Sequence, residues 1–226
     1  MIASLPTTAP TTRPLFEDYR PSSFDDVCGQ DKAIKRLQAI GRRGYGGKAI
    51  WFAGQSGTGK TTLSYIVAEM VADPFCIDEI DAAELTPARL KEIERGCQTY
   101  GMGEKSGRCY IVNESHGLRK DTIRQLLVTL ERIPSHVTWI FTTTNDGQEL
   151  LFDGIDAGPL FSRCLPIKLA QRGLATCFAE RARSIAIRES LAEDTTPVGP
   201  FLKCVKENRN NMRAVLQAVE SGAFLD

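Results

Sequence analysis

A glycine-rich segment that ends in Lys60 and Thr61 has residue types and spacing suited to phosphate chemistry. It reads GQSGTGKT and matches the pattern G-x-x-x-x-G-K-[ST], with an apolar run before it and a helical pattern after it. Glycines let backbone N–H groups converge on a phosphate, the lysine neutralises phosphate oxygens, and the threonine hydroxyl is a ligand for Mg²⁺. The segment therefore predicts a P-loop that binds ATP with Mg²⁺, the metal being held by Thr61. The expected phosphate-binding residues are Gly54, Gln55, Ser56, Gly57, Thr58, Gly59, Lys60, Thr61 and Thr62.

Polar residues follow two further apolar runs, where a parallel sheet presents its ligand-binding edge. Asn113 and Glu114 come directly after Cys109–Val112, and Thr143, Thr144 and Asn145 follow Val137–Thr142. An acidic group there can orient an attacking water, and its neighbour can reach the Mg²⁺ shell through a water. Each run, taken alone, is equally consistent with an ordinary polar strand end.

The surrounding pattern predicts an α/β fold. Strand-like runs alternate with segments of helical period, which favours a five-stranded parallel sheet flanked by helices. After about Lys168 the pattern is helical only, so we expect a disordered arm at 1–14, an α/β nucleotide-binding domain at 15–167 and a small all-α lid domain at 168–226. The expected strands are Ala49–Ala53, Phe75–Ile80, Cys109–Val112, Val137–Thr142 and Cys164–Ile167.

The amino-acid composition limits which classes of function the sequence supports. Lys plus Arg equals Asp plus Glu at 28 each, so overall charge gives no argument for nucleic-acid binding, and any DNA contact needs a local basic face. The seven cysteines are odd in number and include no CxxC, which predicts reduced thiols without a zinc module. No apolar stretch approaches the ~20 residues of a membrane helix, and no signal peptide is recognisable. We expect a cytoplasmic protein without a membrane partner.

Several segments, in order, resemble the clamp-loader AAA+ ATPases, the family of replication factor C small subunits and bacterial polymerase III gamma and tau proteins. The opening FEDYRPSSFDDVCGQDKAIKRL is similar to the family segment that packs on adenine, which implies base contacts from Tyr19, Arg20 and Val27. IVNESH stands at the Walker B position, which makes Glu114 the counterpart of the catalytic glutamate. TTNDGQEL resembles the sensor 1 segment and implies a γ-phosphate contact from Asn145.

Two later segments extend the resemblance. FSRC is similar to the family's arginine-finger motif, so the resemblance implies that Arg163 acts in trans on a neighbouring subunit's nucleotide. NNMRAVLQ resembles the sensor 2 helix, which places Arg213 over the phosphates of the chain's own nucleotide. A surface arginine remains the alternative at both positions.

The resemblance implies an AAA+ core with a helical lid and an ATPase that converts ATP to ADP in an oligomer, with itself or with related AAA+ subunits. Its work would be to load or remodel a protein on DNA during replication or repair, with a sliding clamp or another DNA-bound client as partner. One alternative is a nucleotide-gated binding or structural subunit with little hydrolysis. Another is a helicase-loader-like AAA+ protein.

Three departures from the family pattern limit this expectation. Asn113 stands where the family usually has aspartate, so the Mg²⁺ shell lacks one carboxylate and hydrolysis is expected to be slow. The zinc-binding cysteines of bacterial gamma subunits are absent. The sequence ends at Asp226, after the sensor 2 segment, so we expect a core that lacks the helical collar domain.

Overall fold

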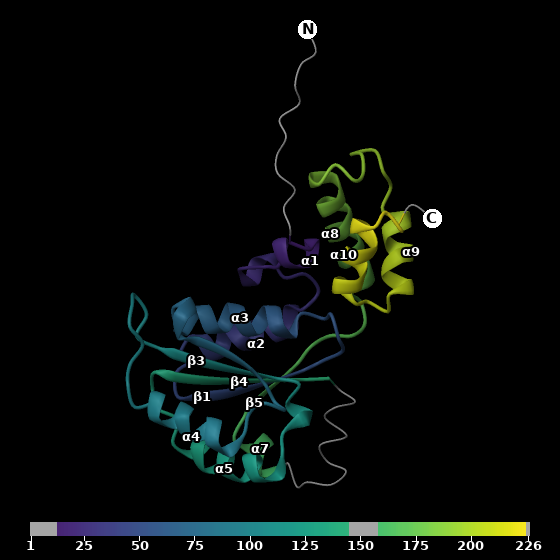
Figure 1. The fold of residues 1–226 in the computed structure, drawn as a ribbon. Helices are drawn as coiled ribbons and strands as arrows, with labels where there is room; N and C mark the ends of the chain where they lie inside the picture. The colour runs from purple at the N-terminus through teal and green to yellow at the C-terminus, as the bar shows by residue number, and fades with distance from the viewer. Residues whose placement is uncertain (1–12, 145–157, 225–226) are drawn as a thin grey trace.

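The computed structural model describes residues 13–144 and 158–224. Its centre is a sheet of five parallel strands in the order β2-β3-β4-β1-β5, which confirms the predicted fold class. The crossover connections are helical and place helices on both faces of the sheet (Figure 1). The strands are β1 (Lys48–Ala53), β2 (Ile77–Asp81), β3 (Arg108–Asn113), β4 (Val137–Thr143) and β5 (Leu165–Lys168).

Side chains alternate between two cores along each central strand, because successive residues of a strand point to opposite faces. Trp51 packs with the α4, α5 and α7 side, whereas its neighbours Ile50 and Phe52 pack with the α2 and α3 side. Figure 1 shows these two helical layers with the sheet between them. The flanking helices are α2 (Asp31–Gly41), α3 (Lys60–Val71), α4 (Pro87–Gly96), α5 (Lys120–Glu131) and α7 (Gly158–Ser162).

Two strands, β2 and β5, start later in the chain than expected. The run Phe75–Ile80 begins as a 3₁₀ turn, η2 (Pro74–Cys76), and the strand starts only at Ile77. Proline has no N–H to donate to a ladder and suits the first turn of a helix. Phe75, within this turn, is 70% exposed. The last strand begins at Leu165 because Cys164 still belongs to the turn that follows α7, where its N–H bonds the carbonyl of Phe161.

Short 3₁₀ turns complete the α/β part. They are η1 (Phe24–Asp26), ahead of α2, and η3 (Ser115–Gly117), directly after β3.

A third core joins the C-terminal helices to the first helix of the described chain. It contains α8 (Ala175–Arg188), α9 (Gly199–Glu207) and α10 (Met212–Glu220), and Leu15 of α1 (Leu15–Asp18) is buried among them. The ribbon shows α1 beside α10, above the α2 and α3 layer (Figure 1). The expected helices after Lys168 are therefore present, and a segment from the other end of the chain packs with them.

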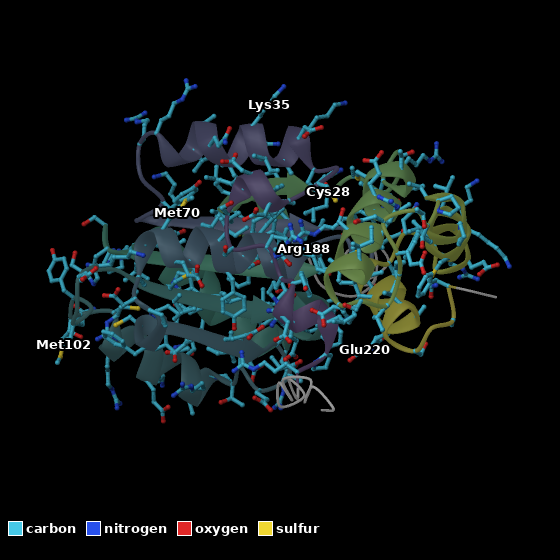
Figure 2. All side chains as sticks on the ribbon, turned by 90° about the horizontal axis from the view of Figure 1, so that it is seen from above. Cys28, Lys35, Met70, Met102, Arg188 and Glu220 are labelled. Atoms are coloured by element: carbon cyan, nitrogen blue, oxygen red, sulfur yellow. The ribbon has the colours of Figure 1, made fainter. Side chains whose placement is uncertain are left out.

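Figure 2 shows the molecule from above, with Cys28 at the junction between the sheet part and the C-terminal helices, and Met102 at the opposite end. All seven cysteines are free thiols, as expected. Within residues 13–144 and 158–224, no helix has the length and apolar character needed to span a membrane.

Candidate functional site

A cavity of about 370 Å³ lies where the P-loop, the ends of β3 and β4 and the C-terminal helices converge. Its lining comes from distant parts of the sequence, among them α1, the start of α3 and the start of α10. Gly54 and Gln55, at the start of the loop, are not among the lining residues. The predicted site residues that line it are Tyr19, Arg20, Val27, Ser56, Gly57, Thr58, Gly59, Lys60, Thr61, Thr62, Asn113, Glu114 and Arg213.

The P-loop connects the end of β1 to the start of α3, as the motif requires. Gly59 has φ +102°, a left-handed conformation at the helix N-cap, and a Cβ built on it would meet no atom within 4 Å. The first backbone N–H groups of α3 lie at the positive end of the helix dipole. The loop therefore offers a phosphate both donors and open space.

Lys60 is buried at this helix start, only 8% exposed. Its Nζ donates hydrogen bonds to the carbonyl oxygens of Gly54 at 2.8 Å and Gln55 at 3.0 Å. Burial lowers the pKa of Lys60, the Glu114 carboxylate opposes that shift, and the Arg213 guanidinium adds to it. A phosphate bound between Lys60 and Arg213 would offset the free-energy cost of burying the Lys60 charge and the repulsion between the two cations.

Gly57 joins the P-loop to the helix that carries Arg213. The Met212 N–H donates to the Gly57 carbonyl at 3.2 Å, while Asn211 caps α10 by accepting from the N–H of Ala214 at 3.3 Å. Gly57 has φ +72°, and a Cβ there would lie 1.9 Å from Asn211 Oδ1. Only glycine therefore fits a loop held this closely against α10.

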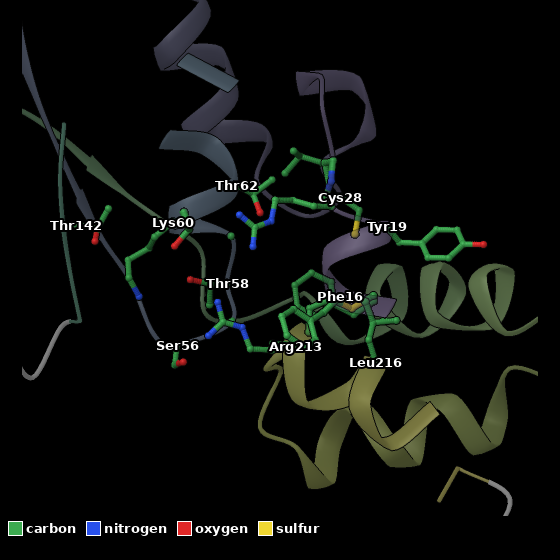
Figure 3. Close-up of a pocket in the computed structure, with 18 of the residues that line it drawn as sticks. Phe16, Tyr19, Cys28, Ser56, Thr58, Lys60, Thr62, Thr142, Arg213 and Leu216 are labelled. Atoms are coloured by element: carbon green, nitrogen blue, oxygen red, sulfur yellow. The ribbon is translucent and has the colours of Figure 1, made fainter. Parts of the chain in front are cut away.

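Arg213 enters the cavity from the first turn of α10. Its guanidinium carbon lies 5.3 Å from the ring centroid of Phe16, a cation–π distance. Figure 3 shows this side chain reaching from α10 towards Thr58, with Phe16 beside it. The predicted sensor 2 arginine and the P-loop therefore share one cavity.

Asn113 is the last residue of β3 and Glu114 follows it, and both line the cavity. Glu114 has φ +48°, an uncommon left-handed conformation for a non-glycine residue, at the start of η3. Its carboxylate lies 3.4 Å from Nδ1 of His116 and its side chain is 50% exposed. This position leaves the carboxylate accessible to solvent at the edge of the cavity.

Sequence reasoning missed Glu79, which lines the same cavity from β2. The amide Nδ2 of Asn113 donates to a carboxylate oxygen of Glu79, and the hydroxyl of Tyr65 donates to the other. The Thr142 hydroxyl donates to Asn113 Oδ1 at 2.9 Å. The only sequence signal for Glu79 was its place one residue before Ile80, the last residue of a strand expected to lie in the sheet.

Sequence reasoning also missed Arg181, which lies at the junction with the helices. The guanidinium of Arg181 in α8 donates to the carbonyls of Asp26 and Tyr19, both at 3.1 Å, and so holds the segment expected to contact the base. Gln30, matched only as part of that segment, is 1% exposed. Its amide donates to the Thr58 carbonyl at 3.1 Å and accepts from the Ala170 N–H at 2.7 Å, so it ties the P-loop to the link with the helices.

Arg163, the predicted arginine finger, is not among the residues that line the cavity. Arg163, at the end of α7, donates to the Pro159 carbonyl at 2.8 Å and forms an ion pair with Glu131 of α5. Hydrogen bonding from Arg163 holds the pKa of Glu131 below its ordinary value. Asn145 lies outside the described residues.

The oxygen donors at the cavity suit Mg²⁺ held together with a nucleotide. Among residues 13–144 and 158–224, no group of three or more His, Cys, Asp or Glu side chains is placed to hold a metal ion. Mg²⁺ usually takes one or two protein oxygens, substrate phosphates and water. The Thr61 hydroxyl and the carboxylates of Glu79 and Glu114 line the cavity and supply such oxygens.

The chain is similar in sequence to curated bacterial DNA polymerase III subunits. The chain is 33% identical over 158 residues to DNA polymerase III subunit gamma/tau of Mycoplasma pneumoniae, an alignment that covers 58% of this chain and 22% of that protein. It is 27% identical over 208 residues to DNA polymerase III subunit gamma of Buchnera aphidicola subsp. Acyrthosiphon pisum, covering 80% of this chain and 54% of the relative. The tau subunit of Bacillus subtilis matches at 30% over 153 residues, 58% of this chain and 27% of that protein. The chain thus spans between about a fifth and about a half of these relatives.

A solved structure, the RuvB Holliday junction branch migration motor of Thermotoga maritima, superposes with a TM-score of 0.65. The match covers 89% of this chain and 64% of that one at 22% identity, which establishes likeness of fold. No protein-family model matches the chain.

Proposed function

We propose that this chain, a homologue of the clamp-loader AAA+ ATPases, binds ATP with Mg²⁺ in the cavity and hydrolyses it as part of an oligomer acting on DNA. The observation that carries the proposal is the convergence of Lys60, Arg213 and Glu114 on one cavity from three separate elements. Two cations can bind phosphate there, and a carboxylate stands at the same opening.

Each of these side chains has a distinct role in the proposal. Lys60 turns from its carbonyl partners to the β- and γ-phosphates, and Arg213 binds the same phosphates from the lid side. Glu114 orients a water for attack and takes its proton. Thr61 holds Mg²⁺ directly and Asn113 reaches its shell through a water, while Mg²⁺, when bound, supplies neutralising charge on the phosphate oxygens. Tyr19, Arg20 and Val27 contact the base.

In this proposal a neighbouring subunit of the oligomer supplies a further cation to each nucleotide site. Arg163 lies away from the cavity of its own chain, and we propose that it serves a neighbouring subunit's nucleotide as an arginine finger. The neighbours are further copies or related AAA+ subunits, since the relatives are named as subunits of a DNA polymerase. The proposed task is to load or remodel a DNA-bound protein such as a sliding clamp, in the cytoplasm.

The test combines turnover with assembly. ATP affinity, ATP turnover with and without primed DNA, and the mass of the ATP-bound complex are measured on one preparation. The proposal expects Mg²⁺-dependent binding, turnover and an ATP-dependent complex larger than one chain. Tight ATP binding without detectable turnover would favour the alternative, a nucleotide-gated binding subunit. The amide at Asn113, in place of a carboxylate, is the feature that suggests this alternative. No nucleotide binding would overturn both.

A further inference from the structure

Glu79 and Asn113 lie on adjacent parallel strands and face the same side of the sheet. In the register of β2 and β3, Glu79 lies opposite Ile111 and Asp81 lies opposite Asn113. Side chains two residues apart along a strand share a face, so Glu79 and Asn113 are diagonal neighbours on the face that carries α3. Ile111 belongs to the core on that face, which confirms the side.

A chain of hydrogen bonds fixes how these two side chains are oriented. Tyr65 of α3 donates to one carboxylate oxygen of Glu79, and Asn113 Nδ2 donates to the other. Thr142 of β4 donates to the Asn113 amide oxygen. Because an ionised carboxylate only accepts hydrogen bonds, the Asn113 amide must turn its NH₂ group towards Glu79. Asn113 therefore bridges β2 and β4 and holds Glu79 at the cavity.

An aspartate at position 113 would change this arrangement. It would place a second carboxylate where the amide now donates to Glu79, and two neighbouring carboxylates cannot both ionise freely. The amide at Asn113 and the carboxylate of Glu79 thus form a matched pair that brings one negative charge to the cavity.

We propose that the carboxylate of Glu79 contributes a negative charge to the coordination shell of the nucleotide's Mg²⁺, in place of a carboxylate at position 113. In this proposal Asn113 positions Glu79. The inference rests on the proposed function, since it concerns the metal that accompanies ATP. Mg²⁺ is a hard cation that favours carboxylate oxygens, as direct ligands or as acceptors from its bound waters. Glu79 lines the cavity together with Thr61 and so faces the space that the metal would share.

The experiment measures the gain in nucleotide affinity on adding Mg²⁺. Binding of a fluorescent ATP analogue is titrated in EDTA and then in excess Mg²⁺, for the full chain and each variant. Glu79→Gln should reduce the Mg²⁺-dependent gain about tenfold or more and leave the metal-free affinity unchanged. The matched control is Asp78→Asn, since Asp78 is on the same strand but lies opposite Tyr110, which packs on the other face. That control should keep the full gain.

Two further variants separate charge from structure. Tyr65→Phe removes a hydrogen-bond donor to Glu79 without removing the charge, and should keep most of the gain. The double variant Glu79→Gln with Asn113→Asp exchanges the carboxylate and the amide, and should restore the gain. Such a recovery would also show that the single variant is folded, and melting temperatures of all variants check this directly.

Two results would overturn the proposal for Glu79 and leave the P-loop assignment standing. One is a gain in nucleotide affinity on adding Mg²⁺ that is as large in Glu79→Gln as in the parent. The other is loss of that gain in a double variant whose melting temperature equals that of the parent. A parent chain that binds no nucleotide, with or without Mg²⁺, would overturn the proposed function as well.

Discussion

The ammonium of Lys60 donates a hydrogen bond to the carbonyl oxygen of Gly54, with 2.8 Å between the two atoms. A second bond reaches Gln55 at 3.0 Å, so the lysine closes the P-loop on itself. Gly54 is in turn tied to the sheet, because its N–H donates to the Thr143 carbonyl at 3.2 Å. Lys60 is thus held by the backbone of the loop that is proposed to bind the phosphates.

Lys60→Ala should abolish ATP binding or weaken it strongly, because the β- and γ-phosphates lose their main fixed cation. Affinity is measured by titration with a fluorescent ATP analogue in Mg²⁺. The control is Lys35→Ala, an exposed lysine of α2, which should bind as the parent does. Equal affinity in Lys60→Ala and parent would refute the P-loop assignment.

The lowered pKa of Lys60 predicts a pH dependence. Burial is the main cause, so the folded chain holds this proton less tightly than the unfolded chain, whose lysine has a pKa near 10.5. Between the lowered pKa and 10.5 the unfolded state binds more protons, and this group makes the fold more stable as pH rises through that window. ATP affinity should fall over the same window, because a neutral amine does not neutralise phosphate.

Titrations of ATP affinity from neutral to alkaline pH, on parent and Lys60→Arg, check this effect. Arginine keeps its charge throughout the window, so the part of the pH dependence due to Lys60 should vanish in that variant. A decline of equal steepness in both proteins would assign the effect to another group.

Glu114→Gln should keep ATP affinity and lower turnover by on the order of 10² or more, because the amide cannot take a proton from water. Phosphate release gives turnover and the titration above gives affinity. Glu92→Gln serves as the control, since Glu92 is exposed on α4 and forms an ion pair with Arg89 there. Parent-like turnover in Glu114→Gln would remove the proposed catalytic role.

Arg163→Ala should leave ATP binding nearly intact and lower turnover by roughly 10³ or more, the effect of an arginine finger acting in trans. A mixture of Arg163→Ala chains and Lys60→Ala chains tests whether Arg163 acts on its own subunit or on a neighbour. In such a mixture some interfaces have an intact arginine finger facing an intact P-loop. Partial activity should return. Absent activity in a mixture shown by mass to co-assemble would contradict the trans role, and so would full activity of Arg163→Ala alone.

Arg213→Ala should weaken the chain's own binding of ATP, in contrast to Arg163→Ala, because Arg213 lines the same cavity as Lys60. Removing this neighbouring cation should also raise the pKa of Lys60 towards its ordinary value. The two arginine variants are compared in one affinity titration. If Arg213→Ala binds ATP as tightly as the parent does, Arg213 is a surface residue beside Phe16 without a role in phosphate binding.

The sequence by itself determined the α/β class, the P-loop and the acidic end of β3, because these features are local in the chain. A strand, a glycine turn and a helix follow one another between Ala49 and Val71, so pattern and spacing are enough to predict them. The same reasoning misjudged the start of β2, since the apolar run at Phe75 continues through Pro74–Cys76 without belonging to the ladder.

Only the tertiary structure decided which distant residues share the cavity. Glu79 and Asn113 meet because β2 and β3 are adjacent and in a fixed register, and neither the strand order nor the register follows from spacing along the chain. Gly57 meets Asn211 and Arg181 meets Tyr19 through packing of the C-terminal helices on the sheet part and on α1. The physical reason is that burial of apolar surface chooses among many arrangements of the same local elements, and that choice depends on the whole chain.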